Sequence, residues 1–233
     1  VARLFVASTH APLLFFSSKG RAYKEKDWRL PQGGPQSPGR FLKNILPLDE
    51  GERITTIMPL PEDEAKREEL DVMFATTQGT VRRNKLSDFA NVNRAGKIAM
   101  KLEEGEGIVD VQLCKESDNV LLTTAKGQCI RFQVSRKNPN GDEVGVRHFQ
   151  GTSSTGVRGI DLAEGDRVIS LAILRHVEAT PEERAAYLKM RRAVLGDNGD
   201  APAEEGDAEE SATAVTLSQD RYTQMSAAEE FIL

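Results

Sequence analysis

The chain has 233 residues, of which 39% are hydrophobic and 29% are charged, and its formal net charge is −5. This length allows one large domain or two small ones with a sizeable core. No stretch approaches the roughly eighteen apolar residues of a membrane span, and the start VARLFVASTH lacks the features of a signal peptide. We therefore expect a cytoplasmic protein with no membrane partner.

The charge is divided unevenly along the chain. Residues 1–174 hold 25 Lys and Arg against 23 Asp and Glu, a net of +2, whereas residues 175–233 hold 6 against 13, a net of −7. The acidity therefore belongs to the last quarter of the chain. The acidic total does not exclude a nucleic-acid partner for the first 174 residues.

One motif occurs three times, as LLFFSSKGRAYK at 13–24, VMFATTQGTVRR at 72–83 and VLLTTAKGQCIR at 120–131. In each copy an apolar run leads into a Gly, and a second short run with basic side chains follows. This pattern predicts a β-hairpin. The predicted turn residues are Gly20, Gly79 and Gly127, because a residue without a Cβ adopts positive φ without strain.

Two further phrases accompany the hairpins. The first places Gly51, Gly105 and Gly165 among acidic residues ahead of a β-branched strand, as in LDEGERITTIMPL at 48–60. We call these the EG turns. The second is a segment that begins with Gly39, Gly96 or Gly156, as in GKIAMKL. The repeating unit is predicted to be an EG-turn strand, the two hairpin strands and a Gly-led strand.

Four-stranded units that repeat at about fifty residues predict radial blades, because one small sheet cannot bury both of its faces. The expected fold is all-β and propeller-like. Residues 1–174 would form three blades, and residues 230–233, within EEFIL, would start a fourth.

Residues 175–229 interrupt the repeat and are predicted to be an insertion. A helix over about 181–195 is indicated by Thr180 as N-cap, Pro181 as first residue and Glu183 as the capping-box partner. Residues of about 197–213 include seven acids and no large apolar side chain, which predicts a disordered linker, and a return segment follows. This linker would either compete with phosphates for nearby cations or serve as a solvated spacer.

Catalytic and metal-binding patterns are missing from the sequence. His10, His148 and His176 are not at metal-ligand spacing from one another or from a cysteine, and no nucleophile elbow, P-loop or His-Glu-x-x-His motif occurs. Cys114 and Cys129 are fifteen residues apart and are expected to be buried, reduced core thiols rather than a disulfide or a metal-binding pair. We therefore predict no catalytic residue, no metal and no cofactor in this chain.

Basic residues recur at equivalent places after the hairpin glycines and in the Gly-led segments. If the units stack radially, these cations would form a curved positive belt that binds DNA phosphates without sequence preference. The alternative is that they only solubilise strand edges. The predicted DNA-binding residues are Arg21, Lys24, Arg40, Lys43, Arg82, Arg83, Lys85, Arg94, Lys97, Arg131, Arg136, Lys137, Arg147 and Arg158.

Several of these motifs in order resemble the C-terminal domain of the bacterial DNA gyrase A subunit. The motifs are LFVASTHAPLLFFSSKGRAYKEKDWRLP, PLDEGERI, VMFATTQGTVRR and GVRGIDLAEGD, and the resemblance resumes at MSAAEEFIL. It covers residues 1 to about 174 and corresponds to the N-terminal portion of that domain. The resemblance implies a β-pinwheel, in which four-stranded blades exchange strands with their neighbours and a basic rim wraps double-stranded DNA.

The resemblance also implies a larger enzyme, an ATP-dependent type II topoisomerase (an isomerase) that introduces negative supercoils. Its partners would be the B subunit, together with the rest of the A subunit, in an A2B2 holoenzyme, with ATP and Mg bound elsewhere, in a bacterial, nucleoid-associated setting. The family's glutamine-, arginine- and glycine-rich box and its later blades are not in this sequence. We therefore expect weak DNA binding and an incomplete wrap. Alternatives are the equivalent domain of topoisomerase IV and a propeller-like protein-interaction module.

Overall fold

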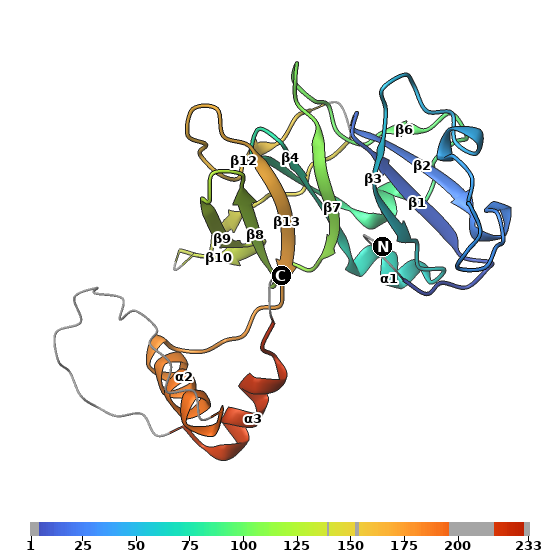
Figure 1. The fold of residues 1–233 in the computed structure, drawn as a ribbon. Coiled ribbons are helices and arrows are strands. Elements are labelled where there is room, and N and C mark those ends of the chain that lie inside the picture. Colours follow the sequence, from blue (N-terminus) through green and yellow to red (C-terminus); the bar gives the residue numbers. More distant parts are fainter. Residues whose placement is uncertain (1–4, 139, 152–153, 196–216, 231–233) are drawn as a thin grey trace. The chain divides into compact units, whose positions relative to one another are not determined.

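The computed structural model describes residues 5–138, 140–151, 154–195 and 217–230 (Figure 1). The chain divides into two compact units, Val1–Leu174 and Arg175–Leu233. The predicted acidic linker at about 197–213 lies outside the described residues, as does most of the predicted start of a further blade at 230–233. Among the described residues, no helix combines the length and apolar character needed to cross a bilayer.

The first unit contains three antiparallel sheets and a short hairpin. The first sheet has the strand order β3 (Ile54–Pro59), β1 (Pro12–Ser17), β2 (Arg21–Lys26) and β6 (Lys97–Ile98). The second has the order β7 (Ile108–Cys114), β4 (Asp71–Thr76), β5 (Thr80–Lys85) and β12 (Val157–Arg158). The third has the order β13 (Val168–Leu174), β8 (Asn119–Thr124) and β9 (Cys129–Gln133). The separate hairpin pairs β10 (Ser135–Lys137) with β11 (Glu143–Gly145).

The predicted all-β array of small sheets is confirmed, but the strands group differently from the predicted linear unit. Each hairpin pairs with the EG-turn strand that follows it in the chain, not with the one that precedes it. The first two sheets take their fourth strand, β6 or β12, from the Gly-led segment of the next repeat. This is the strand exchange that the resemblance implies. The Gly-led segment at Gly39 contains a 3₁₀ turn, η2 (Leu42–Asn44), instead of a strand.

The hairpin turns repeat one hydrogen-bonding scheme. The hydroxyl oxygens of Ser17, Thr76 and Thr124 accept from the backbone N–H four residues later, at 3.2, 3.1 and 3.0 Å. Each turn Gly has positive φ, and a Cβ at Gly20 would overlap the Met100 carbonyl oxygen. Gly127, in the third sheet, has open space in the same direction. The third sheet, as described, has no strand beyond β9.

The core lies between the sheets. Phe16 from the first sheet meets Phe74 from the second and Phe89 from η3 (Leu86–Phe89), with ring centroids 5.4 Å apart in both pairs. The neighbours of Phe74 along β4, Met73 and Ala75, face the third sheet, where they pack with Val120. Because β4 has a sheet on each face, all six of its residues are buried.

The sheets converge along their EG-turn strands, since β7 packs against both β3 and β13 (Figure 1). Backbone hydrogen bonds join neighbouring sheets at the hairpin turns. Ile108 N–H donates to the Ser18 carbonyl at 3.1 Å, and Val168 N–H donates to the Thr77 carbonyl at 3.0 Å. The strands β6 and β12 therefore occupy the edges farthest from the line of convergence, which we call the outer edges.

The short helix α1 (Glu64–Glu69) and the 3₁₀ turn η1 (Asp27–Arg29) complete the first unit. The second unit contains α2 (Pro181–Leu195) and α3 (Gln219–Ala227). At the start of α2, Thr180 N–H donates to Glu183 Oε2 at 3.0 Å and Glu183 N–H donates to Thr180 Oγ1 at 3.2 Å. Tyr187 and Met225 lie in the small core between these helices.

Candidate nucleic-acid interface

Charge is segregated within each repeat of the first unit. Three segments that lead toward the EG turns contain no Asp or Glu at all: residues 28–48, 89–102 and 144–160. They contain three, three and two Lys or Arg residues, respectively. We call them the first, second and third connections. A stretch with cations and no acids favours contact with a polyanion.

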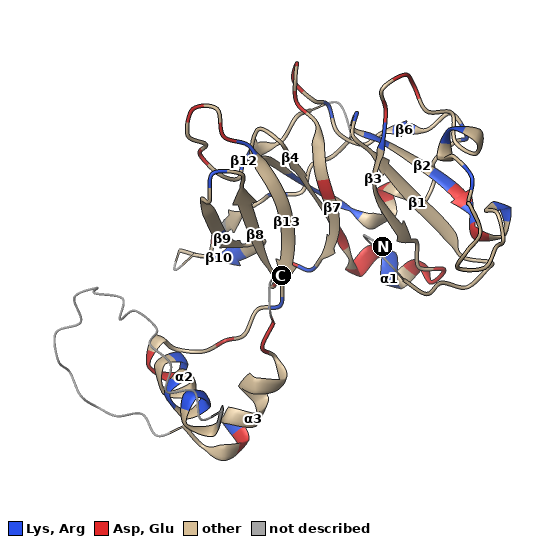
Figure 2. Cartoon of the chain, viewed as in Figure 1, with Lys and Arg blue, Asp and Glu red and all other residues tan. Residues whose placement is uncertain are grey.

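Each EG turn, next to β3, β7 or β13, carries two or more acids (Figure 2), and further acids lie at residues 62–71 and at Glu116 and Asp118. Part of this negative charge is held by the turn itself. Glu52 Oε2 accepts from Asp49 N–H at 2.8 Å, and Glu106 Oε2 accepts from Glu103 N–H at 3.0 Å. Some cations reach these acids, since Arg21 pairs with Asp49 at 3.2 Å, but the connections themselves contain no acid.

Six of the predicted DNA-binding residues are exposed and have no ion-pair partner among the described residues: Arg40, Lys43, Arg94, Arg131, Arg136 and Lys137. Two more are exposed but engaged. The Arg147 guanidinium lies 4.7 Å from the centroid of the Phe149 ring, and Arg158 lies 3.2 Å from Asp161. All eight can reach solvent. Five of them belong to the three connections.

Four other predicted cations are half-buried and make contacts within the protein. Arg21 pairs with Asp49 at 3.2 Å, and Lys97 Nζ donates to the Asp88 carbonyl at 2.7 Å. Lys85 lies 3.1 Å from Asp71. Lys24 donates to the Ala90 carbonyl, and burial lowers the pKa of its ammonium group. Arg21, Lys24 and Lys85 thus fasten hairpin return strands to other segments, and Lys97 fastens β6 to η3.

Arg82 differs most from the prediction, because its side chain is fully buried at 0% exposure and cannot meet a phosphate in this fold. Its guanidinium donates to Asn84 Oδ1 at 2.7 Å and to the carbonyls of Gly151, Ser154 and Thr155. It also lies over the ring of Phe149. Burial lowers the pKa of this guanidinium. Arg82 therefore anchors the third connection.

The prediction that Arg83 lies on the surface is also wrong, since its side chain is 0% exposed. Its Nε donates to Asp71 Oδ2 at 2.8 Å, its Nη2 to Glu116 Oε1 at 2.7 Å and its Nη1 to the Val146 carbonyl at 3.2 Å. The strand β5 lies between two other strands of its sheet, the third connection covers Arg82, and Glu116 and Val146 cover Arg83. Both arginines are therefore forced inward, where they bind carbonyls and carboxylates.

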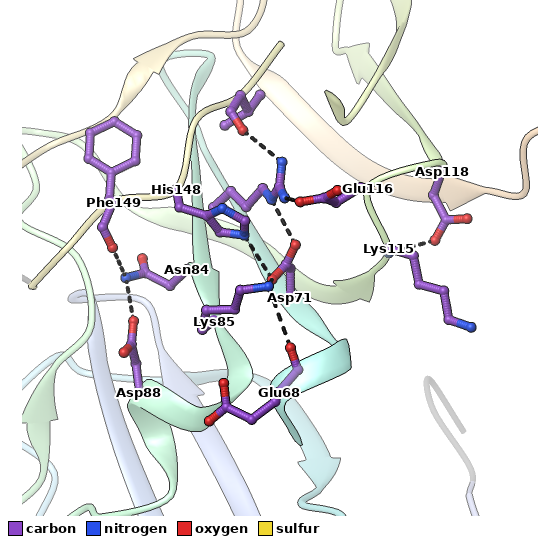
Figure 3. Close-up of polar contacts among 12 residues, drawn as sticks. Glu68, Asp71, Asn84, Lys85, Asp88, Lys115, Glu116, Asp118, His148 and Phe149 are labelled. Atoms are coloured by element: carbon purple, nitrogen blue, oxygen red, sulfur yellow. Dashed lines mark hydrogen bonds and ion pairs between the residues drawn. The ribbon is translucent and has the colours of Figure 1, made fainter. Parts of the chain in front are cut away.

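The carboxylate of Asp71 is the centre of a network that the sequence analysis missed. Its oxygens contact Arg83, Lys85 and, at 3.0 Å, His148 Nε2 (Figure 3). Asp71, Glu116 and His148 together offer three potential metal ligands within 4.8 Å of one another. Arg83 and Lys85 already supply positive charge to these carboxylates, so we interpret the cluster as an ion-pair network. The sequence feature that could have indicated this network is Asp71 itself, an acid at the first position of the apolar strand β4.

Exposed apolar residues on the connections were a second omission. Phe41 in the first connection and Ile98 in the second are exposed, although each stands among cations. Their equivalence could have been recognised from the sequence, because each is the second residue after the Gly that starts its segment.

Comparison with known proteins supports the repeat and the fold. The family described as the DNA gyrase C-terminal domain, beta-propeller, matches residues 70–115, 118–136 and 145–175. The DNA gyrase A subunit of Granulibacter bethesdensis is 48% identical over 240 residues, which cover 100% of this chain and 25% of that protein. The chain thus spans about a quarter of the length of this curated relative.

Two solved structures share the fold. The C-terminal domain of DNA topoisomerase IV aligns with a TM-score of 0.60 and 24% identity, over 72% of this chain and 48% of that chain. The DNA gyrase A C-terminal domain aligns with a TM-score of 0.53 and 21% identity, over 72% of this chain and 49% of that chain. At these identities the two structures show the fold alone.

Proposed function

Because the chain belongs to the DNA gyrase C-terminal domain family, we propose that its first unit binds double-stranded DNA through phosphate contacts, without sequence preference. The observation that carries this proposal is the threefold segregation of charge, with acid-free connections and acidic EG turns. The contacts would come from exposed cations of the connections, among them Arg40, Lys43, Arg94 and Arg147. Exposed Arg131, Arg136 and Lys137 would extend this surface.

In this proposal the chain is part of the A subunit of an ATP-dependent type II topoisomerase. The A subunit would work together with a B subunit in an A2B2 holoenzyme. The sheets of residues 1–174 would bend DNA along the outer edges, and residues 175–229 would be an insertion between blades. Bending a duplex over such a surface costs several kcal/mol, about 1–6 for a short site, which many phosphate contacts would offset. Identity to a gyrase A subunit favours gyrase over topoisomerase IV. A location with the bacterial nucleoid is part of the same proposal.

The test is a titration of the chain against a labelled duplex of arbitrary sequence, followed by fluorescence anisotropy at several salt concentrations. We expect the logarithm of the association constant to fall linearly with the logarithm of salt. Replacing Arg40, Lys43, Arg94 and Arg147 by Ala should make that slope shallower by about three to four.

A matched variant controls for net charge. Arg53, Lys66, Lys115 and Arg167 are also exposed, but none of them lies in the three connections. Replacing these four by Ala removes the same charge and should change the slope much less. Equal effects of the two variants would contradict a localised interface. No binding at low salt would contradict the proposal and favour the protein-interaction alternative.

A further inference from the structure

Ile98 and Arg158 occupy equivalent positions in two neighbouring sheets. Each is the second residue after a Gly, in the outer-edge strand β6 or β12. Each stands opposite the first residue after a hairpin Gly, since Ile98 pairs with Arg21 and Arg158 pairs with Thr80. In the first connection the second residue after Gly39 is Phe41. The three connections thus carry Phe, Ile and Arg at one repeated sequence position, with Ile98 and Arg158 in outer-edge strands and Phe41 directly before the 3₁₀ turn η2.

This position is exposed in every copy. Phe41 is 83% exposed, Ile98 is 54% exposed and the side chain of Arg158 is 76% exposed. Arg158 belongs to the second sheet, which has another sheet packed on each face, and it is still exposed. A residue at this position is therefore exposed even in a sheet that has a neighbouring sheet on each face.

Cations flank the two apolar residues in the sequence. Phe41 lies between Arg40 and Lys43, and the second connection carries exposed Arg94 and Lys101 on either side of Ile98. No acid occurs in either connection. A surface with apolar side chains between phosphate-binding cations matches the minor groove, where deoxyribose and base edges lie between two rows of phosphates.

We propose that Ile98 and Phe41 make apolar contacts with the deoxyribose and minor-groove edge of bound duplex DNA, while Arg158 makes an ionic contact from the equivalent position. This inference rests on the proposed DNA-binding function and specifies which part of the duplex the outer edge meets. Apolar contact in the groove supports bending, because side chains that enter there partly unstack base steps. The wrapped duplex would then be held by two kinds of force with different salt dependence.

Salt titration of binding separates these forces. The Ile98→Thr variant keeps a β-branched side chain in β6 and loses most of the apolar surface. We expect its affinity for the duplex to fall by about three- to tenfold at every salt concentration, with the slope unchanged. The Ile98→Arg variant copies the residue found at the equivalent position of the second sheet. It should recover affinity at low salt and give a steeper slope by about one.

Ile169→Thr is the matched control, because Ile169 is 53% exposed and lies in β13, outside the connections. It should leave both affinity and slope unchanged. Thermal unfolding of each variant verifies that the fold is intact. Equal affinities of Ile98→Thr and the unmodified chain would overturn the inference, as would a changed slope in Ile98→Thr. Failure of the unmodified chain to bind at low salt would instead overturn the proposed function itself.

Discussion

Arg83 and Asp71 form an ion pair with a 2.8 Å contact in which both side chains are almost completely excluded from water. Asp71 lies in β4 and Arg83 in β5, so the pair joins the two strands of one hairpin. Through Glu116 and the Val146 carbonyl, the same arginine reaches two segments that come later in the chain. The pair therefore fixes the second sheet to its surroundings.

Replacing Arg83 by Met should lower the free energy of unfolding of the first unit by about 3 kcal/mol or more, because Asp71 loses its main buried partner. Denaturation in urea, followed by circular dichroism, measures this difference. Arg94→Met is the control, since Arg94 is exposed and should change stability by less than about 0.5 kcal/mol. A stability loss no larger than that of the control would contradict the structural role.

Alanine at Gly20 should destabilise the fold more than alanine at Gly127. Both glycines have positive φ, +75° and +89°, so either substitution brings backbone strain of about 1–2 kcal/mol. Only at Gly20 does the new Cβ also meet a backbone carbonyl, that of Met100. Urea midpoints of the two variants give the comparison. Equal losses would mean that the outer strand adjusts without cost.

Stability should fall at high pH because of Tyr23. Burial, assisted by the hydrogen bond to Glu52, raises the pKa of this phenol from 10.0 to about 12. Its contribution is complete below pH 10 and is lost as the pH rises toward 12, since the unfolded chain ionises first. Across that window the unmodified chain should lose up to about 1.4 kcal/mol per pH unit more than Tyr23→Phe. Parallel stability curves would contradict this prediction.

The two cysteines should react at very different rates with a thiol reagent. The prediction of two buried thiols is wrong for Cys129, which is exposed in β9, and right for Cys114, where burial raises the pKa of the thiol to about 12. Because the thiolate is the reactive form, one thiol should be modified quickly and the second only after unfolding. Absorbance of a chromogenic disulfide reagent counts both. Two fast thiols in the native chain would show that the second and third sheets open readily.

The turns could be predicted from the sequence because their cause is local. A hydroxyl residue, two further residues and Gly suffice to define each hairpin turn, and the structure shows the corresponding hydrogen bond in all three copies. The pairing of strands could not be predicted in the same way. Ile98 pairs with Arg21 across 77 positions of sequence, and nothing in either segment alone specifies that partner.

The predicted interface was partly wrong for a related reason. Arg83 and Arg131 both stand four residues after a hairpin Gly, and Arg82 stands three residues after one, yet only Arg131 is exposed. What distinguishes them is the cover over the return strand of the second hairpin, where the third connection encloses Arg82, and Glu116 and the Val146 carbonyl enclose Arg83. An Arg that reaches a carbonyl or a carboxylate is compatible with burial, so residue type alone could not decide.

The exchange of outer strands has a consequence for synthesis of the protein. The first hairpin is translated by residue 26, yet its sheet obtains a fourth strand only when residues 97–98 have left the ribosome. The second hairpin is likewise translated by residue 85, and its sheet obtains a fourth strand only when residues 157–158 have been translated. Each of these two sheets is thus finished by the repeat that follows it, and until then its hairpin has an open edge. Folding of such an array should advance one repeat behind translation, and an interruption in any repeat should leave the preceding sheet incomplete.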